Sequence, residues 1–550
     1  MMQSHFDALV VGAGFGGIYQ LHKFVKLGLN TKLIDMASDV GGTWYHNRYP
    51  GAMSDSYSMV YRYSWDKDDL VTYPWKNRYV HQPEVLDYLR HVVERHDLRK
   101  YMQFNTELTR AEYDEGSNRW VVHTSTGDIY TVRYLVTALG ILSRINFPDI
   151  PGLKAFKGEI YHTGKWPETH DFRNKHVGVI GNGSTGVQVI TALGPEAKSL
   201  VSFQRRPQYS VPSGNRALSK EERDDINGRY DEIWESVRSS INGVGIPESS
   251  CPSLSVSAEE RERVFEEAWQ GGNGFRFMFS TFNDIITSEE ANEEACKFLR
   301  RKIKETVKNP EKARKLTPTE IFARRPICDS GYFEQFNRSN VDLVLLSENP
   351  IKTVTERGIL MQDGTHHDLD VIIFATGFDA VDGNWTRTTI KGRGGKSLKE
   401  HWVKNGSPTS LLGSFVPDFP NMFMLFGPSS PFGNGPTVLE VQVDFVIDVV
   451  QQAEKSNKEH ADSSTNGVAD ALTLRGPVIE ALPSAVDVWV KKCEAAANMT
   501  LFPRLDNWIL GKNVPGKTPS VLVWLGGIGQ FRKYLQDIAE GGYQIFRPFS

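Results

Sequence analysis

The chain has 550 residues, which suggests three or four domain-sized units at roughly 150 residues per domain. Its 63 Lys and Arg residues nearly balance its 67 Asp and Glu residues, so it lacks the basic surplus of an electrostatic nucleic-acid binder. Its 48 glycines follow no Gly-X-Y period, and its four cysteines form no CxxC pair, which excludes a collagen-like chain, a zinc ribbon and a dithiol redox centre.

The first ordered pattern in the chain is an apolar run over residues 6–11, which predicts a strand. Gly12-Ala-Gly-Phe-Gly-Gly17 follows, then a helical pattern up to Leu27 and a second strand over Thr31–Ile34. This order is a βαβ opening, whose glycine-rich turn and helix N-terminus bind a pyrophosphate. Asp35 lies 23 residues after Gly12 and supplies a carboxylate that suits ribose hydroxyls but repels a 2′-phosphate, which favours FAD.

A second βαβ opening follows a segment, residues 104–140, whose alternating pattern predicts a small antiparallel sheet and a buried strand. The opening comprises a strand over His176–Ile180, the turn Gly181-Asn-Gly-Ser-Thr-Gly186, a helix and a strand over Leu200–Phe203. Arg205 lies 24 residues after Gly181, and its guanidinium suits the 2′-phosphate of NADPH. The alternatives are a solvated arginine pair and two glycine-rich turns that bind no ligand.

The pattern changes to helical spacing with mixed charge over about residues 217–320, which predicts a helical insertion within the second nucleotide domain. Strands resume at Val341–Leu346 and Val371–Phe374, and a helix-rich stretch covers 437–454. Residues 455–470 are polar and charged, and we interpret them as a surface loop.

Residues 156–167 carry a motif that selects among flavoproteins. Phe156, Gly158, His162, Trp166 and Pro167 fill the fixed places of the pattern FxGxxxHxxxW followed by Pro or Asp. The stretch resembles the identifying motif of the type I (class B) flavoprotein Baeyer–Villiger monooxygenases. His162 could be an acid/base or a structural residue on a connector between domains, and we favour the structural role, as for Trp166.

The resemblance extends over essentially the whole chain and is strongest to the cyclohexanone monooxygenases of that family. Residues 47–52 are similar to its flavin-contacting segment, Ala375-Thr-Gly377 to its segment between domains, and residues 508–517 to its mobile loop over NADP. The implied fold is α/β, with two Rossmann-like dinucleotide-binding domains of the three-layer type and a helical insertion. The expected segments are FAD-binding domain 1–141, NADP-binding domain 142–213, helical insertion 214–323, NADP-binding domain 324–380 and FAD-binding domain 381–550.

The resemblance implies an oxidoreductase that uses FAD, NADPH and O2 to convert a ketone into an ester or lactone, through a C4a-peroxyflavin and a tetrahedral Criegee-type adduct. We expect a cytoplasmic monomer whose partners are the ketone and O2, without nucleic acid or membrane. The expected catalytic residues are Arg325, Asp55 and Trp508. A guanidinium keeps its proton at working pH and so stabilises an anionic oxygen, while Asp55 would orient it.

The residues expected to bind the cofactors fall into two groups. The motifs indicate Gly12, Gly14, Gly17, Asp35, Asn182, Gly183, Ser184, Thr185, Gly186, Arg205 and Arg206. The resemblance adds Thr43, Trp44, Tyr45, His46, Met53, Ser54, Asp55, Tyr61, Leu108, Gln188, Trp508 and Arg324, the last standing where the family usually has lysine.

Two other functions remain open at this point: a flavin monooxygenase that oxidises sulfides or amines, and a non-enzymatic NADPH- or flavin-binding sensor. Trp166-Pro167 and Arg325 favour ketone oxidation over the first, and the complete set of catalytic positions favours it over the second. The ketone itself, cyclic or linear, stays undetermined. The segments we expect to line its pocket are 279–282 and 428–436.

Overall fold

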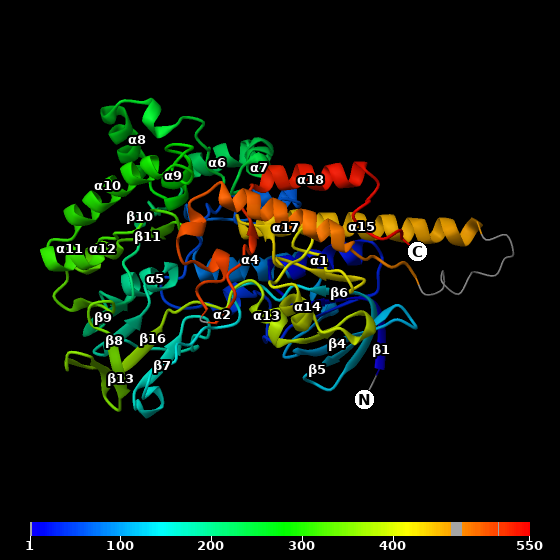
Figure 1. Cartoon of the computed structure of the whole chain (residues 1–550), viewed down its shortest axis with the longest axis horizontal. Coiled ribbons are helices and arrows are strands. Elements are labelled where there is room, and N and C mark those ends of the chain that lie inside the picture. Colours follow the sequence, from blue (N-terminus) through cyan, green and yellow to red (C-terminus); the bar gives the residue numbers. More distant parts are fainter. Residues whose placement is uncertain (1–2, 464–475, 515, 550) are drawn as a thin grey trace.

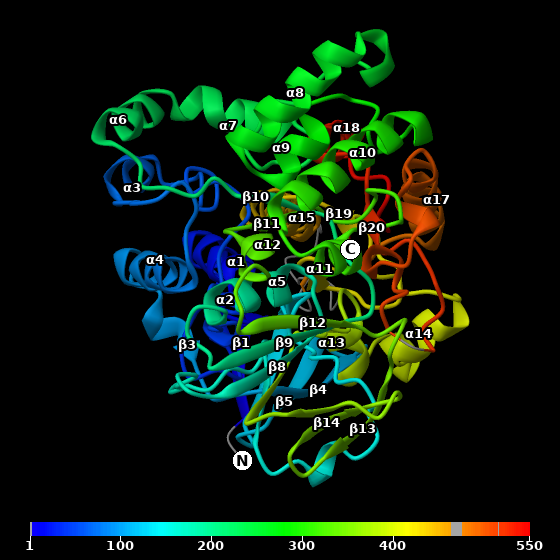
Figure 2. The ribbon, with the colours of Figure 1, turned by 90° about the vertical axis from the view of Figure 1, so that its left-hand side faces the viewer.

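Two sheets lie side by side along the long axis of the molecule, and each contains a strand that leads into one of the glycine-rich turns (Figure 1). The computed structural model describes residues 3–463, 476–514 and 516–549. Helices cover both sheets, and a separate group of helices sits on the second one (Figures 1 and 2). The expected α/β class with two dinucleotide-binding folds and a helical insertion is confirmed.

The first sheet has eight strands. In it β1 lies between β2 and β6, parallel to both, while β4 and β5 pair antiparallel beside β6. Two strands from the C-terminal half, β17 and β18, complete the sheet. The strands are β1 (Gln3–Val11), β2 (Thr31–Ile34), β3 (Met102–Gln103), β4 (Leu108–Asp114), β5 (Arg119–Thr124), β6 (Ile129–Thr137), β17 (Thr389–Lys391) and β18 (Met422–Met424).

Helix α1 buries its apolar face, including Ile18, Leu21 and Phe24, because these residues recur at helical spacing. That face meets helix α15 from the far end of the chain, so the first core joins both termini. The helices around this sheet are α1 (Phe15–Lys26), α2 (Thr43–His46), α3 (Lys67–Thr72), α4 (Gln82–Arg95), α13 (Gly383–Arg387), α14 (Leu398–Lys404), α15 (Gly435–Ser463), α17 (Pro483–Asn498) and α18 (Ile528–Glu540).

The second sheet has five parallel strands in the order β12-β9-β8-β16-β7, with α5 and α12 packed nearby. The three-stranded antiparallel sheet β13-β14-β15 lies at its end (Figure 2). These elements are β7 (Glu159–His162), β8 (His176–Ile180), α5 (Ser184–Leu193), β9 (Ser199–Gln204), α12 (Tyr332–Gln335), β12 (Val341–Leu345), β13 (Ile351–Thr355), β14 (Gly358–Met361), β15 (His366–Asp368) and β16 (Val371–Phe374).

The helical insertion begins its helices at polar caps. Ser257 and Ser288 each accept an N–H from the first turn of the helix that follows, which satisfies donors that the helix leaves unpaired. Its helices are α6 (Lys220–Gly228), α7 (Tyr230–Ser239), α8 (Ala258–Gly271), α9 (Gly274–Phe279), α10 (Glu289–Thr306) and α11 (Pro310–Leu316), and the paired strands β10 (Ser210–Pro212) and β11 (Ile327–Asp329) flank it in the sequence.

Two predictions of local structure are wrong. Residues 455–463 are not a loop, because α15 continues to Ser463; residues 464–470 lie outside the described residues. High charge does not by itself end a helix, and Lys455 and Glu459 pair four residues apart, which supports one. His162 ends the edge strand β7 rather than lying on a connector, because β7 pairs with β16.

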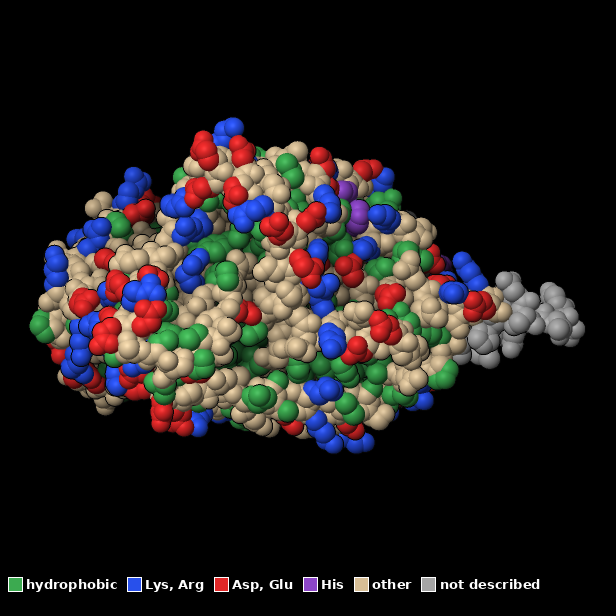
Figure 3. All heavy atoms as spheres, turned by 90° about the horizontal axis from the view of Figure 1, so that it is seen from above, with side chains coloured by type: hydrophobic (Ala, Val, Ile, Leu, Met, Phe, Trp, Pro, Cys, Tyr) green, Lys and Arg blue, Asp and Glu red, His purple; other side chains and the backbone are tan. Residues whose placement is uncertain are grey.

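The surface mixes charges of both signs. On the face shown in Figure 3, Lys and Arg side chains alternate with Asp and Glu, and no large field of one sign forms. None of the described helices combines the length and apolarity needed to cross a membrane.

Candidate active site

A cavity of about 1290 Å³ lies between the two sheets and reaches both glycine-rich turns. Most of the predicted site residues line it. They are Gly12, Gly14, Asp35, Thr43, Trp44, His46, Met53, Ser54, Asp55, Tyr61, Leu108, Asn182, Gly183, Ser184, Thr185, Gln188, Arg205, Arg206, Arg324, Arg325 and Trp508. Three predicted residues, Gly17, Tyr45 and Gly186, are not part of its wall.

The glycines of each turn divide into two roles. A Cβ added to Gly17 would lie 1.8 Å from the Gly12 oxygen, and one added to Gly186 would lie 2.1 Å from the Gly181 oxygen. These two positions therefore let the helix approach the strand rather than line the cavity. In contrast, a Cβ at Gly183 would meet nothing within 4 Å, so this backbone is open to a ligand. Each turn thus forms a cradle for a pyrophosphate at a helix N-terminus.

Asp35 stands at the end of β2 beside the first cradle. Its Oδ2 accepts the Ala13 N–H at 2.6 Å and its Oδ1 accepts the Ala37 N–H at 2.7 Å. Burial raises the pKa of Asp35, and these two N–H groups oppose the shift. Each oxygen keeps a free lone pair for a ribose hydroxyl, which fits the ribose of FAD.

The segment of residues 44–61, which lies between the two glycine-rich turns in the sequence, is cross-linked by hydrogen bonds. Trp44 Nε1 donates to the Tyr61 hydroxyl at 3.0 Å, and the two rings meet edge to face. Gln188 on α5 donates to the Met53 carbonyl at 3.0 Å and accepts from the Tyr49 hydroxyl at 2.8 Å. Burial raises the pKa of Tyr49 to about 12, so its hydroxyl stays protonated. The second nucleotide-binding helix is thereby tied to the flavin segment.

Tyr45 does not share this arrangement. Its hydroxyl lies 2.6 Å from the Ser38 hydroxyl, and the Arg48 guanidinium stacks over its ring. The resemblance implied a cofactor contact for Tyr45, but only its neighbours Trp44 and His46 line the cavity.

An ion pair lies where the two dinucleotide-binding folds meet. Arg325 Nη2 lies 2.6 Å from Asp55 Oδ2, and Arg325 Nη1 lies 3.3 Å from the Ser184 hydroxyl. The Phe275 ring lies 5.7 Å from the guanidinium, as in a cation–π contact. The side chains of Arg325 and Asp55 are 33% and 18% exposed, so the pair is half-buried yet open to the cavity.

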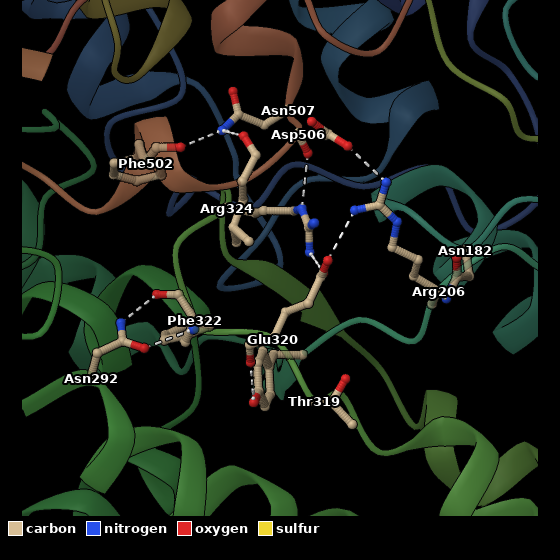
Figure 4. Close-up of polar contacts among 12 residues, drawn as sticks. Asn182, Arg206, Asn292, Thr319, Glu320, Phe322, Arg324, Phe502, Asp506 and Asn507 are labelled. Carbon is tan, nitrogen blue, oxygen red and sulfur yellow. Dashed lines mark hydrogen bonds and ion pairs between the residues drawn. The ribbon is translucent and has the colours of Figure 1, made fainter. Parts of the chain in front are cut away.

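Three arginines gather at the second cradle (Figure 4 shows two of them). Arg206 pairs with both Glu320 and Asp506, each at 2.9 Å. Arg324 pairs with the other oxygen of Glu320 at 2.6 Å. Arg205 is exposed at the cavity wall and forms no ion pair with the described part of the chain.

Trp508 enters the cavity wall from a one-turn 3₁₀ segment, Trp508–Leu510, that Asn507 caps. Its ring centre lies 6.0 Å from that of Phe432. Further along the same segment, Lys517 Nζ lies 2.8 Å from Asp379 and also pairs with Asp382, both just after the Ala375-Thr-Gly377 segment. These contacts anchor the Trp508 segment to the junction between the two dinucleotide-binding folds.

His162 and Trp166 are buried and do not line the cavity. His162 Nδ1 accepts the Gly164 N–H at 3.0 Å, and its other ring nitrogen lies 3.4 Å from the Thr376 hydroxyl. Burial lowers the pKa of His162 to about 4, so the ring is neutral near pH 7. This environment supports the structural role.

The pocket segments were predicted in part. Residues 430–436 line the cavity, but residues 279–282 do not, because Phe279 and Phe282 pack in the core of the helical insertion. Sequence reasoning missed Phe275, Glu320 and Asp506. Phe275 and the two acidic residues are found by their contacts.

The two cradles open into one cavity, one beside a carboxylate and the other beside guanidinium groups. This arrangement defines an enzyme that brings FAD and NADP together, and the donors present fit both groups. Residues 7–211 match the family described as "Flavin-binding monooxygenase-like". A Baeyer–Villiger monooxygenase of Pseudooceanicola batsensis is 47% identical over 98% of this chain and 95% of its own, and a phenazine N-monooxygenase of Lysobacter antibioticus is 45% identical over 99% and 97%.

The fold agrees with these relatives. The crystal structure of a cyclohexanone monooxygenase from Rhodococcus, bound to NADP+, covers 99% of both chains at 50% identity with a TM-score of 0.94. The chain belongs to the Baeyer–Villiger monooxygenases. It is an FAD- and NADPH-dependent enzyme that inserts one oxygen atom beside a ketone carbonyl.

Proposed function

We propose that Arg325 is the catalytic residue and that Asp55 holds it in place. The observation that carries this proposal is the Arg325–Asp55 ion pair, 2.6 Å long, in the cavity wall between the two cradles. When bound, FAD supplies the oxygen-activating chemistry and NADPH supplies the hydride.

Several features of the chain support this role for Arg325. A guanidinium keeps its charge throughout the reaction, so it stabilises the oxyanion that forms on the carbonyl oxygen of the ketone. Asp55 fixes the plane of the guanidinium, and the Ser184 hydroxyl lies beside its other end. The Phe275 ring excludes water from one side, which strengthens the electrostatic interaction.

An Arg325→Ala variant tests the proposal. We expect the variant to retain FAD and to oxidise NADPH with release of hydrogen peroxide, while ester formation falls by at least about 100-fold. Gas chromatography of products from one cyclic and one long-chain linear ketone measures the loss and shows which class is used. Arg338→Ala, at an exposed position of the same chain, is the control. Unchanged ester formation by Arg325→Ala would refute the role.

The remaining site assignments belong to the same proposal. Asp35 and the residues around Trp44 and Tyr61 bind FAD, while Arg205, Arg206 and Arg324 bind the 2′-phosphate of NADPH. Trp508 contacts the nicotinamide side. Their positions in the wall of one cavity support these roles.

A second candidate activity is N-oxygenation of a fused aromatic heterocycle. The 45% identity to a phenazine N-monooxygenase favours it, and the rings of Phe275, Phe432 and Trp508 line the cavity and suit a planar substrate. Incubation with phenazine and NADPH distinguishes the two activities. Formation of an N-oxide faster than of any ester would make N-oxygenation the main activity.

We also infer the five-segment domain division given above, a monomer and a cytoplasmic location. The entry of β17 and β18 into the first sheet supports a FAD-binding domain built from both ends of the chain. Analytical ultracentrifugation tests the monomer. The four cysteines are free thiols, which suits a reducing compartment.

A further inference from the structure

Both ends of the Arg206 guanidinium are paired with carboxylates. Nη1 lies 2.9 Å from Glu320 Oε1 and Nη2 lies 2.9 Å from Asp506 Oδ2, and Figure 4 shows the two contacts on opposite sides of the fork. A phosphate that binds this fork end-on, with one oxygen on each Nη, uses the same two nitrogens. It then competes with the two carboxylates for them.

The two carboxylates are not held equally. Glu320 is 29% exposed, and its second oxygen lies 2.6 Å from Arg324, so it bridges two arginines. Asp506 is 50% exposed, and within the described ranges Arg206 is its one ion-pair partner. An ion pair this exposed contributes at most about 1 kcal/mol, so Asp506 is the carboxylate that a phosphate displaces.

We propose that Asp506 is a specificity-determining residue that competes with the 2′-phosphate of NADPH for Arg206. The proposal rests on the proposed role of Arg206 as a 2′-phosphate ligand. A dianionic phosphate attracts the guanidinium more strongly than one carboxylate does, and it repels Asp506. A dinucleotide without a 2′-phosphate leaves the Arg206–Asp506 pair intact.

The competition for Arg206 is connected to the catalytic cavity because Asp506 and Trp508 belong to the same short segment of the chain. Asp506 lies two residues before Trp508, and its backbone carbonyl accepts a hydrogen bond from Arg324 Nε at 3.2 Å. The side-chain pair with Arg206 is thus one of two contacts that hold this end of the Trp508 segment against the cations (Figure 4). Binding of a 2′-phosphate releases the contact between Asp506 and Arg206, so it makes the segment around Trp508 more mobile. By linkage, movement of that segment changes the affinity for the 2′-phosphate.

Isothermal titration of the holoenzyme with 2′,5′-ADP tests the competition, because this probe carries the 2′-phosphate but no nicotinamide. We expect Asp506→Asn to bind 2′,5′-ADP about fivefold more tightly than the parent chain, as removal of an exposed ion pair allows. Binding of 5′-ADP, which lacks the 2′-phosphate, should not change. Asp225→Asn, at an exposed carboxylate that pairs with Arg229, is the matched control.

Hydrogen exchange of a peptide covering residues 502–514 tests the link to Trp508. We expect 2′,5′-ADP to speed exchange there in the parent chain and to have no further effect in Asp506→Asn or in a second variant, Asp506→Ser. Equal affinity of the parent chain and both variants for 2′,5′-ADP would overturn the proposal. Arg206→Ala separates the two assignments. If this variant binds 2′,5′-ADP as tightly as the parent chain, Arg206 is not a 2′-phosphate ligand. If Arg206→Ala binds 2′,5′-ADP more weakly but the Asp506 variants bind it as the parent chain does, only the competition is refuted.

Discussion

Glu440 on α15 is a buried carboxylate whose ionisation should control stability. It is 6% exposed, and its two oxygens accept the backbone N–H and the hydroxyl of Ser64 at 2.6 and 2.5 Å. Arg238 donates to the same hydroxyl at 2.9 Å but does not itself pair with the carboxylate. Burial raises the pKa of Glu440 from 4.5 to about 7, against the opposing effect of the Ser64 hydrogen bonds.

The sign of the effect follows from proton binding. Between pH 4.5 and 7 the folded chain keeps a proton on Glu440 that the unfolded chain has lost, so stability falls as the pH rises through this window. Above pH 7 both states are ionised and the loss is complete. One pKa unit corresponds to 1.36 kcal/mol, so the raised pKa costs about 3 kcal/mol at pH 8.

A Glu440→Gln variant removes this cost, because the amide keeps the volume and can still accept the Ser64 N–H. We expect its stability relative to the parent chain to grow by about 2–3 kcal/mol between pH 5 and pH 8. For a cooperative unit of roughly 150–250 residues this corresponds to about 4–12 °C in Tm, and less for a larger unit.

Thermal unfolding of the holoenzyme, followed by flavin fluorescence at several pH values, measures the difference. Glu459→Gln, at an exposed position of the same helix, is the control and should show a constant difference. If Glu440→Gln has the same Tm difference at pH 5 and pH 8, Glu440 does not titrate in this window and the reasoning is refuted.

Two further predictions concern the cofactors. Asp35→Asn should weaken FAD binding by about tenfold or more, because an amide NH2 must then face the N–H of Ala13 or Ala37. The flavin-to-protein absorbance ratio after gel filtration measures FAD occupancy, and normal occupancy would contradict the ribose role of Asp35. Lys517→Met leaves Asp382 without its cation and Asp379 with Arg144 alone, so the KM for NADPH should rise roughly tenfold at unchanged FAD content. An unchanged KM would show that this anchor does not hold the Trp508 segment.

The sequence predicted those parts of the fold that depend on neighbouring residues. Each βαβ opening is a local pattern of strand, glycine turn and helix, and the first and last glycines of each turn leave no room for a Cβ. The same locality explains the correct helices of the insertion, which begin at serine caps. Charge alone misled the prediction for residues 455–463, since a charged segment can continue a helix that begins before it.

The sequence by itself therefore determined the two cradles, the cofactor class and the motif residues around them. Only the tertiary structure decided which side chains meet. Asp55 and Arg325 are far apart in the chain, and Arg206 and Asp506 are 300 residues apart, yet both pairs form ion pairs at the cavity. Phe279 and Phe282, which we expected to line the pocket, pack in the core of the helical insertion. Contacts of this kind depend on how packed elements close around a cavity, and no periodicity within one segment records that closure.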